Sequence, residues 1–101
     1  MPSSSKRKGS KWEVQITEIA KEKGLPAVRA WGSDGRSMNE ASSVDCLVAG
    51  LRVQAKIRKS LASFLQVPEG CDAVFFRQDR GPGMVLMNLS DFLNLLRQDE
   101  D

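Results

Sequence analysis

The clearest pattern of apolar and polar positions lies in the middle of the chain, where two apolar runs flank Ala49-Gly50. Apolar and polar residues alternate along the second run, which is typical of a strand with one buried face. Two such runs around a two-residue turn predict a β-hairpin. With this turn, Val48 pairs with Leu51 and Asp45 falls opposite Gln54.

A second pattern, at helical spacing, precedes the hairpin. Trp12, Ile16, Ile19 and Ala20 form an apolar stripe, which predicts a helix with one face toward a core. Ser10 would begin this helix, because Glu13 stands three residues later as in an N-terminal capping box. Gly24 is a suitable end for it.

The remaining segments complete an α-β-β-β-α-β-β-α order. We expect an α/β fold of the small restriction-endonuclease-like kind, with a mixed central sheet of about five strands flanked by helices. A flexible basic arm at 1–9 would precede a single domain at 10–97 and an acidic tail at 98–101. The predicted elements are a helix at 10–24, a strand at 27–31, a polar loop at 32–43, the hairpin at 44–59, a short helix from Ser60 to Pro68, strands at 73–77 and 84–87, and a last helix capped by Ser90 or Asp91.

Composition narrows the class of protein. The chain has 101 residues, of which 41% are hydrophobic, enough for one modest core. No apolar run approaches the roughly 20 residues needed to span a bilayer, and no apolar stretch follows the N-terminal basic cluster, so no secretory signal is expected. Cys46 and Cys71 lie in apolar surroundings without metal-ligand spacing, which favours reduced core thiols and a cytoplasmic location.

The absence of histidine excludes several chemistries. The chain contains no histidine, so acid–base catalysis by imidazole and triads that depend on it are ruled out. Two cysteines alone cannot complete a zinc site. A metal bound here would have oxygen ligands, which makes Mg²⁺ or Mn²⁺ the expected ion.

The charge is distributed unevenly. Residues 1–59 hold 12 Lys and Arg against 6 Asp and Glu, whereas residues 60–101 hold 3 against 7. A basic part of this kind is an electrostatic footprint for nucleic acid. A solvated surface would have the same composition, so charge alone leaves both interpretations open.

The hairpin carries the strongest chemical signal. On the predicted register, the Asp45 carboxylate, the Gln54 amide oxygen and the Lys56 ammonium lie on one face of the sheet. This is how a hard divalent cation and a phosphate are held together. An aspartate within an apolar strand costs several kcal/mol unless it is paired or bound to metal. A cross-strand pair with Arg52 is the structural alternative.

These residues and their order resemble the PD-(D/E)xK nuclease superfamily, and most of all its archaeal-type Holliday-junction resolvases. The segment Lys8-Gly9-Ser10-Lys11-Trp12-Glu13 is similar to the opening of that family, and Lys23 to Ala30 is similar to its first strand. The likeness covers about residues 8–96 in element order. It implies a metal-dependent, structure-selective endonuclease that hydrolyses phosphodiester bonds in branched DNA, and a homodimer, because two strands of a junction are cut.

The resemblance also implies roles for individual residues. Asp45 would ligate the metal, Glu13 would reach the metal or its water, and Lys56 would position the attacking water or stabilise charge on the phosphate. Ser33 falls near a loop serine used close to the scissile phosphate. The cations expected to contact DNA are Lys6, Arg7, Lys8, Lys11, Arg29, Arg36, Arg52, Arg58 and Lys59.

Gln54 departs from the family pattern, since most members have Glu or Asp there. Its neutral amide offers one carbonyl oxygen, so metal affinity should be lower. Mrr-type restriction nucleases carry a similar Gln-x-Lys, which keeps cleavage of duplex DNA open as an alternative. A DNA-binding protein of the same fold without catalysis is another alternative. Glu13 could also serve only as the capping-box partner of Ser10, and Lys56 as an exposed strand lysine.

Overall fold

A computed structural model describes residues 4–30, 32 and 34–99, with side chains from Arg7 to Gln98 within those ranges. The chain forms two compact units, one up to Ile57 and the other from Arg58 onward. No helix among the described residues is long and apolar enough to cross a membrane.

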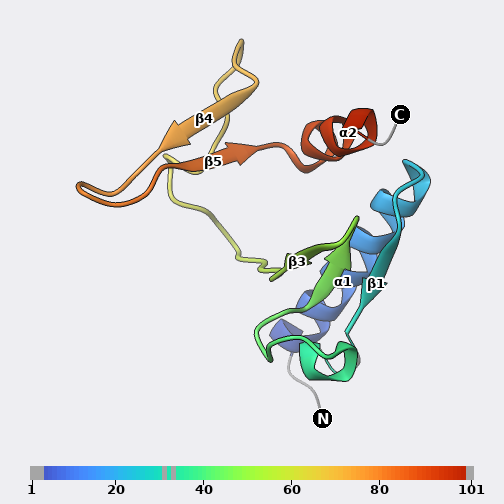
Figure 1. Ribbon diagram of the computed structural model, residues 1–101. Helices are drawn as coiled ribbons and strands as arrows, with labels where there is room; N and C mark the ends of the chain where they lie inside the picture. Colours follow the sequence, from blue (N-terminus) through green and yellow to red (C-terminus); the bar gives the residue numbers. More distant parts are fainter. Residues whose placement is uncertain (1–3, 31, 33, 100–101) are drawn as a thin grey trace. The chain divides into compact units, whose positions relative to one another are not determined.

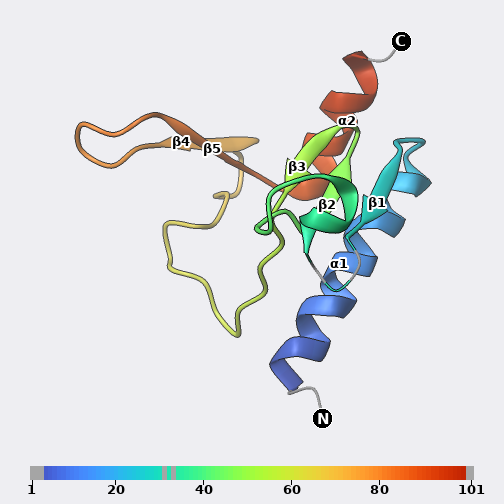
Figure 2. The same ribbon diagram turned by 60° about the horizontal axis from the view of Figure 1, so that its bottom comes forward.

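The first unit is a helix packed on a three-stranded sheet (Figure 1). It contains α1 (Ser4–Glu22), β1 (Ala27–Arg29), the 3-10 helix η2 (Gly35–Met38), β2 (Cys46–Val48) and β3 (Leu51–Val53). The sheet is antiparallel with β2 in the centre. Figure 2 shows that the N-terminal turns of α1 project past the sheet.

The core of this unit lies between α1 and one face of the sheet. Opposite residues of paired strands share a face, and the pairs Ala27–Val48 and Arg29–Cys46 belong to the face that α1 covers. Ala27, Cys46 and Val48 are buried there. The α1 residues that complete this core are Ile16 and Ala20, followed by Leu25 after the helix end.

The hairpin turn agrees with the sequence prediction. Val48 pairs with Leu51, and Ala49 and Gly50 have φ angles of 49° and 81°. Positive φ at both central residues is the geometry of a type I′ turn, whose twist matches that of the two strands. Gly24, with φ of 81°, ends α1 as expected.

The start of α1 differs from the prediction. The helix begins at Ser4, so Ser10 and Glu13 lie in its interior and form no capping box. Residues 4–9, expected in a flexible arm, are helical instead. Lys and Arg are good helix formers, and the single Gly9 costs only about 1 kcal/mol relative to alanine.

The second unit contains a two-stranded antiparallel sheet and a helix. β4 (Ala73–Phe76) pairs with β5 (Met84–Met87), and α2 (Leu89–Asp99) follows. These strands confirm the predicted ones. α2 begins before Ser90 and Asp91, and Phe92 N–H donates to the Asn88 carbonyl at 3.1 Å, so Asn88 occupies the cap position instead of either residue.

The short helix predicted from Ser60 to Pro68 is absent. The segment forms turns, with Leu65 N–H bonded to the Ala62 carbonyl at 2.9 Å. Short helices need a packed apolar face to be stable, but Leu61 and Phe64 are mostly exposed. The α/β class is therefore confirmed, while the described strands form two antiparallel sheets of three and two strands instead of one mixed sheet.

Candidate metal and phosphate site

Glu13 is a buried carboxylate on the face of α1 that packs against the sheet. Only 5% of the residue is exposed. Arg29 on β1 donates from Nε to Glu13 Oε1 at 3.1 Å, and the Arg29 side chain keeps 36% of its surface exposed. A buried carboxylate needs a compensating partner, and this ion pair supplies one.

Asp45 is held by both neighbouring strands. Its N–H donates to the Val53 carbonyl and its carbonyl accepts from Ala30 N–H, each at 2.8 Å. Its Oδ2 accepts from Ala55 N–H, also at 2.8 Å. The carboxylate thus contacts the backbone between Gln54 and Lys56.

The hairpin has the predicted register, but its ladder stops one residue before the predicted pair Asp45–Gln54. The β2–β3 ladder ends at the pair Cys46–Val53, and the Asp45 N–H shares the Val53 carbonyl as its partner. Two residues of one strand then oppose one of the other, as in a β-bulge. Ala55 N–H lies where the next bond of the ladder would form, and it donates to the Asp45 carboxylate instead.

Cys46 follows Asp45 in the chain and lies opposite Arg29 in the sheet. Its thiol is fully buried, and burial raises its pKa to about 11, with the negative charges of Glu13 and Asp45 adding to the shift and Arg29 opposing it. Arg29, the cross-strand partner of Cys46, is also the ion-pair partner of Glu13, so β1 connects the buried thiol with the buried carboxylate of α1.

Gln54 and Lys56 follow the end of β3. Gln54 is exposed, and its Nε2 donates to the Ser43 carbonyl at 3.3 Å, which leaves the amide oxygen as the atom suited to a metal. Lys56 is exposed. Within the part of the chain that the structure describes, its ammonium makes no hydrogen bond or ion pair.

The structural alternative for Asp45 does not form. Arg52 lies 3.9 Å from Glu40, between Nη1 and Oε2, and is largely exposed. Asp45 instead bonds to backbone, as described above. The carboxylate is thus not part of a cross-strand ion pair with Arg52.

The predicted ligands carry oxygen atoms, which hard divalent cations prefer. Across residues 4–30, 32 and 34–99, no three Asp, Glu or Cys side chains gather as a metal cluster. The predicted ligands are two carboxylates, Glu13 and Asp45, with the neutral amide of Gln54. Oxygen atoms of these types suit Mg²⁺ or Mn²⁺, and the Arg29 guanidinium already places one positive charge beside Glu13.

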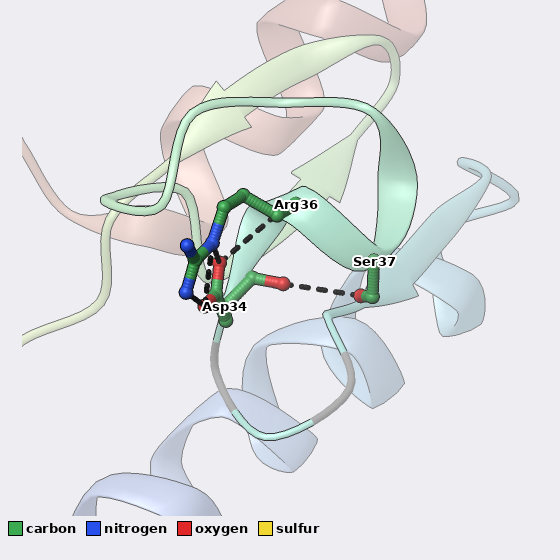
Figure 3. A network of polar contacts seen from close by, with 3 residues as sticks. All are labelled: Asp34, Arg36 and Ser37. Atoms are coloured by element: carbon green, nitrogen blue, oxygen red, sulfur yellow. Dashed lines mark hydrogen bonds and ion pairs between the residues drawn. The ribbon is translucent and has the colours of Figure 1, made fainter.

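The loop before β2 has its own polar network (Figure 3). Asp34 accepts from the backbone N–H and Nε of Arg36, each at 3.0 Å, and Ser37 Oγ donates to the Asp34 carbonyl at 3.1 Å. The ion pair holds the pKa of Asp34 below its usual range and raises the pKa of Arg36. Arg36, expected to contact DNA, is thus engaged by Asp34. Ser33 lies outside the described residues.

The other predicted DNA contacts differ in their surroundings. The α1 residues Arg7, Lys8 and Lys11 are exposed. The side chain of Lys6 lies outside the described part of the chain. Arg58 and Lys59 are exposed in the second unit.

Sequence reasoning missed the Glu13–Arg29 pair. The signal for Arg29 was present, because it is two residues from Ala27 and so shares its buried face. Of the two cysteines, the burial expected of Cys46 is confirmed, but Cys71 is exposed; both are free.

Comparison of the chain with protein-family models, with curated proteins and with solved structures finds no match.

Proposed function

We propose that this protein is a metal-dependent, structure-selective DNA endonuclease that hydrolyses phosphodiester bonds in branched DNA such as four-way junctions. One observation carries the proposal. The Asp45 carboxylate accepts from the Ala55 N–H at 2.8 Å, so it lies against the backbone between Gln54 and Lys56. The resemblance to restriction-endonuclease-like resolvases requires an aspartate beside this segment.

The residues have separate roles in the proposed reaction. Asp45, Glu13 and the Gln54 amide oxygen would hold Mg²⁺ or Mn²⁺, which when bound supplies an activated water and a Lewis acid for the phosphate. Lys56 is placed on the same segment as Gln54, with its charge exposed for a phosphate oxygen. The buried position of Glu13 and the three backbone bonds of Asp45 would fix both carboxylates before the substrate arrives.

The surface of α1 supports binding to a polyanion. Arg7, Lys8 and Lys11 occur on its projecting N-terminal turns (Figure 2), in the same unit as the proposed site. Phosphate contacts by such cations supply affinity without reading the base sequence, which agrees with selection by DNA shape. We further propose a homodimer, for which exposed apolar residues such as Phe75 and Val85 offer surface.

A non-catalytic DNA-binding protein is the second candidate. Two observations favour it: Gln54 is neutral where a third carboxylate would strengthen metal binding, and Arg29 already compensates Glu13. This candidate requires junction binding that Mg²⁺ does not alter.

The decisive experiment is cleavage of a labelled four-way junction beside a linear duplex of the same sequence, in Mg²⁺ or Mn²⁺. Asp45→Ala and Lys56→Ala test the site, and Asp72→Ala, an exposed acidic residue of the other unit, is the matched control. We expect paired nicks on the junction that fall by at least about 100-fold in both site variants and persist in the control.

Other outcomes would redirect the assignment. Cutting of the duplex alone would favour the restriction-type nuclease. Tight junction binding without cleavage in either metal would favour the binding protein, and no binding even at low salt would contradict every DNA-based function.

A further inference from the structure

The N-terminal turns of α1, residues 4–12, extend beyond the part of the helix that packs on the sheet (Figure 2). The buried residues of α1 begin only at Glu13 and continue with Ile16, Thr17 and Ala20. At about 1.5 Å per residue, the N-terminal turns span roughly 13 Å. They gain little stability from the sheet, because a helix is stabilised mostly by a packed apolar face.

The exposed cations of the N-terminal turns share one side of the helix. At about 100° per residue, Arg7, Lys8 and Lys11 fall within an arc of roughly 100°. This side faces away from Ile16 and Ala20, which pack in the core. Among the residues that the structure describes, none of the three cationic side chains forms a hydrogen bond or an ion pair. Their charges are therefore available to a ligand.

These charges also oppose the helix that carries them. The first turn of α1 contains no acidic residue, so the charge of Arg7 stands near the positive end of the helix dipole. Arg7 and Lys11 are four residues apart, a spacing at which like charges repel each other. Gly9 adds a cost of about 1 kcal/mol relative to alanine. An anionic ligand would relieve the repulsion, which indicates a polyanion as the partner of this segment.

We propose that the N-terminal turns of α1 lie in the major groove of B-form duplex DNA. A helix with its side chains is about 10–12 Å across, and the major groove is about 12 Å wide. Arginine and lysine donors on such a helix reach phosphates at the edges of the groove and the N7 and O6 acceptors of guanine. The inference rests on the proposed function, because it takes DNA as the ligand, but it requires no metal.

The composition of the segment favours a nucleic acid over a membrane surface. A helix that lies on a membrane needs an apolar face, whereas residues 4–12 contain a single large apolar side chain, that of Trp12 at their end. Duplex RNA provides a sharp comparison with DNA. The major groove of A-form RNA is deep and narrow and does not admit protein side chains, so a helix that requires the groove should discriminate between the two.

Acidic residues limit the contact to the N-terminal turns. Glu18 and Glu22 continue the same side of the helix as Arg7 and Lys11, at about 100° per residue, and both are exposed. Their carboxylates repel phosphates. The change of charge along α1 therefore determines which end of the helix enters the groove. Lys21, an exposed cation of the acidic end, serves as the matched control.

The test is protection of DNA from dimethyl sulfate, which methylates guanine N7 in the major groove and adenine N3 in the minor groove. The full chain is bound to a four-way junction in EDTA, so that no strand is cut. We expect N7 protection of at least about fivefold in the arms and no protection of N3. At equal saturation of the junction, the combined change Arg7→Gln, Lys8→Gln and Lys11→Gln should abolish the protection, and Lys21→Gln should retain it.

Two further measurements do not depend on saturating a weakened variant. Wild type should bind duplex DNA at least about tenfold more tightly than duplex RNA of the same sequence, measured by fluorescence anisotropy. Hydrogen exchange of the backbone amides in residues 4–12 should slow by about tenfold or more when DNA binds, because the DNA suppresses opening of these turns. The amides of β4 should exchange at an unchanged rate.

The remaining outcomes separate this inference from the proposed function. Protection of N3 alone, N7 protection that persists in the triple variant, or equal affinity for duplex RNA overturns the position of α1 in the groove. Binding to phosphatidylserine vesicles as tight as binding to DNA also overturns it. In each case, cleavage of the junction in Mg²⁺, measured separately, keeps the proposed function standing. No binding of wild type to junction or duplex at low salt overturns both.

Discussion

Cys46 has the most distinctive chemical surroundings among the titratable side chains that the structure describes. Its thiol is fully buried and touches no solvent. Burial and the charges of Glu13 and Asp45 raise its pKa to about 11. A thiol of this kind is protonated at neutral pH and is a poor nucleophile. Cys46 therefore serves as a small apolar residue of the core.

This environment predicts unequal reactivity of the two cysteines. At about pH 8, the thiolate fraction of Cys46 should be about 100-fold below that of an ordinary thiol with pKa 9.0. The fraction rises only as the pH approaches the raised pKa. We expect iodoacetamide to label exposed Cys71 in the native protein while Cys46 stays unmodified, as measured by peptide mass spectrometry. In denaturant both should label; equal native rates would contradict the burial of Cys46.

At the scale of residues, the sequence identifies candidate site residues better than it identifies the groups that those residues contact. Alternation in the hairpin singles out Asp45, Gln54 and Lys56, and the Asp45 carboxylate does contact that segment. The face of the strand that Arg29 occupies follows from its spacing to Ala27, but its pairing with Glu13 depends on α1 packing against β1. The sequence therefore left Arg29 grouped with the other cations.

At the scale of elements, the turns were predictable where a glycine takes the positive φ angle that the turn requires. Gly50 and Gly24 take positive φ angles at the hairpin turn and the helix end, as their positions suggested. The end of the β2–β3 ladder was not predictable, because a side chain, Asp45, takes a backbone donor from the partner strand. The start of α1 was missed because lysine-rich residues were interpreted as a free arm.

The hairpin turn contains a residue that the geometry disfavours. Ala49 has φ of 49°, and an alanine in this left-handed region costs roughly 1 kcal/mol, whereas asparagine tolerates it. We expect Ala49→Asn to stabilise the protein by about 0.5–1 kcal/mol in urea unfolding. Ala73→Asn, in strand β4 and without positive φ, is the control and should not stabilise it, because asparagine is disfavoured in strands. Lower stability of Ala49→Asn would argue against the type I′ turn.

The loop before β2 depends on a close approach at Gly35. A Cβ added there would stand 2.8 Å from Val44 Cβ and would also collide with the Ala41 carbonyl oxygen. We expect Gly35→Ala to destabilise the protein by roughly 1–3 kcal/mol, measured by thermal or urea unfolding. The same change at Gly83, where a Cβ meets nothing within 4 Å, should have little effect. A neutral Gly35→Ala would show that the loop packs differently.

At the scale of the whole molecule, composition and element order predicted more of the fold than the apolar pattern of a single short segment did. Composition and element order predicted an α/β protein with a hairpin at Ala49-Gly50 and strands at 73–77 and 84–87, and these are present, whereas the single mixed sheet is not. The helix expected after Ser60 is absent because Leu61 and Phe64 have little to pack against. Single-sequence patterns record which residues are apolar, but tertiary contacts decide whether a short apolar segment becomes a helix.

The uneven distribution of charge along the chain is also a property of the whole molecule, and it bears directly on DNA binding. The exposed cations Arg7 and Lys11 flank Lys8 on α1, whereas Arg77, Arg80 and Arg97 belong to the acidic part of the chain. Each phosphate contact releases counterions, so binding weakens with salt in proportion to the number of contacts. The slope of log affinity against log salt therefore counts the cations that touch the backbone.

Neutralising the α1 cations should change that slope. We expect the triple change Arg7→Gln, Lys8→Gln and Lys11→Gln to reduce it by about 2–3 between roughly 50 and 200 mM salt, because each contact contributes about 0.9. Glutamine keeps the helix intact. Fluorescence anisotropy with a labelled four-way junction gives the slopes. The matched change Arg77→Gln, Arg80→Gln and Arg97→Gln should leave the slope unchanged, and equal losses from both triples would mean that net charge, and not the α1 surface, governs binding.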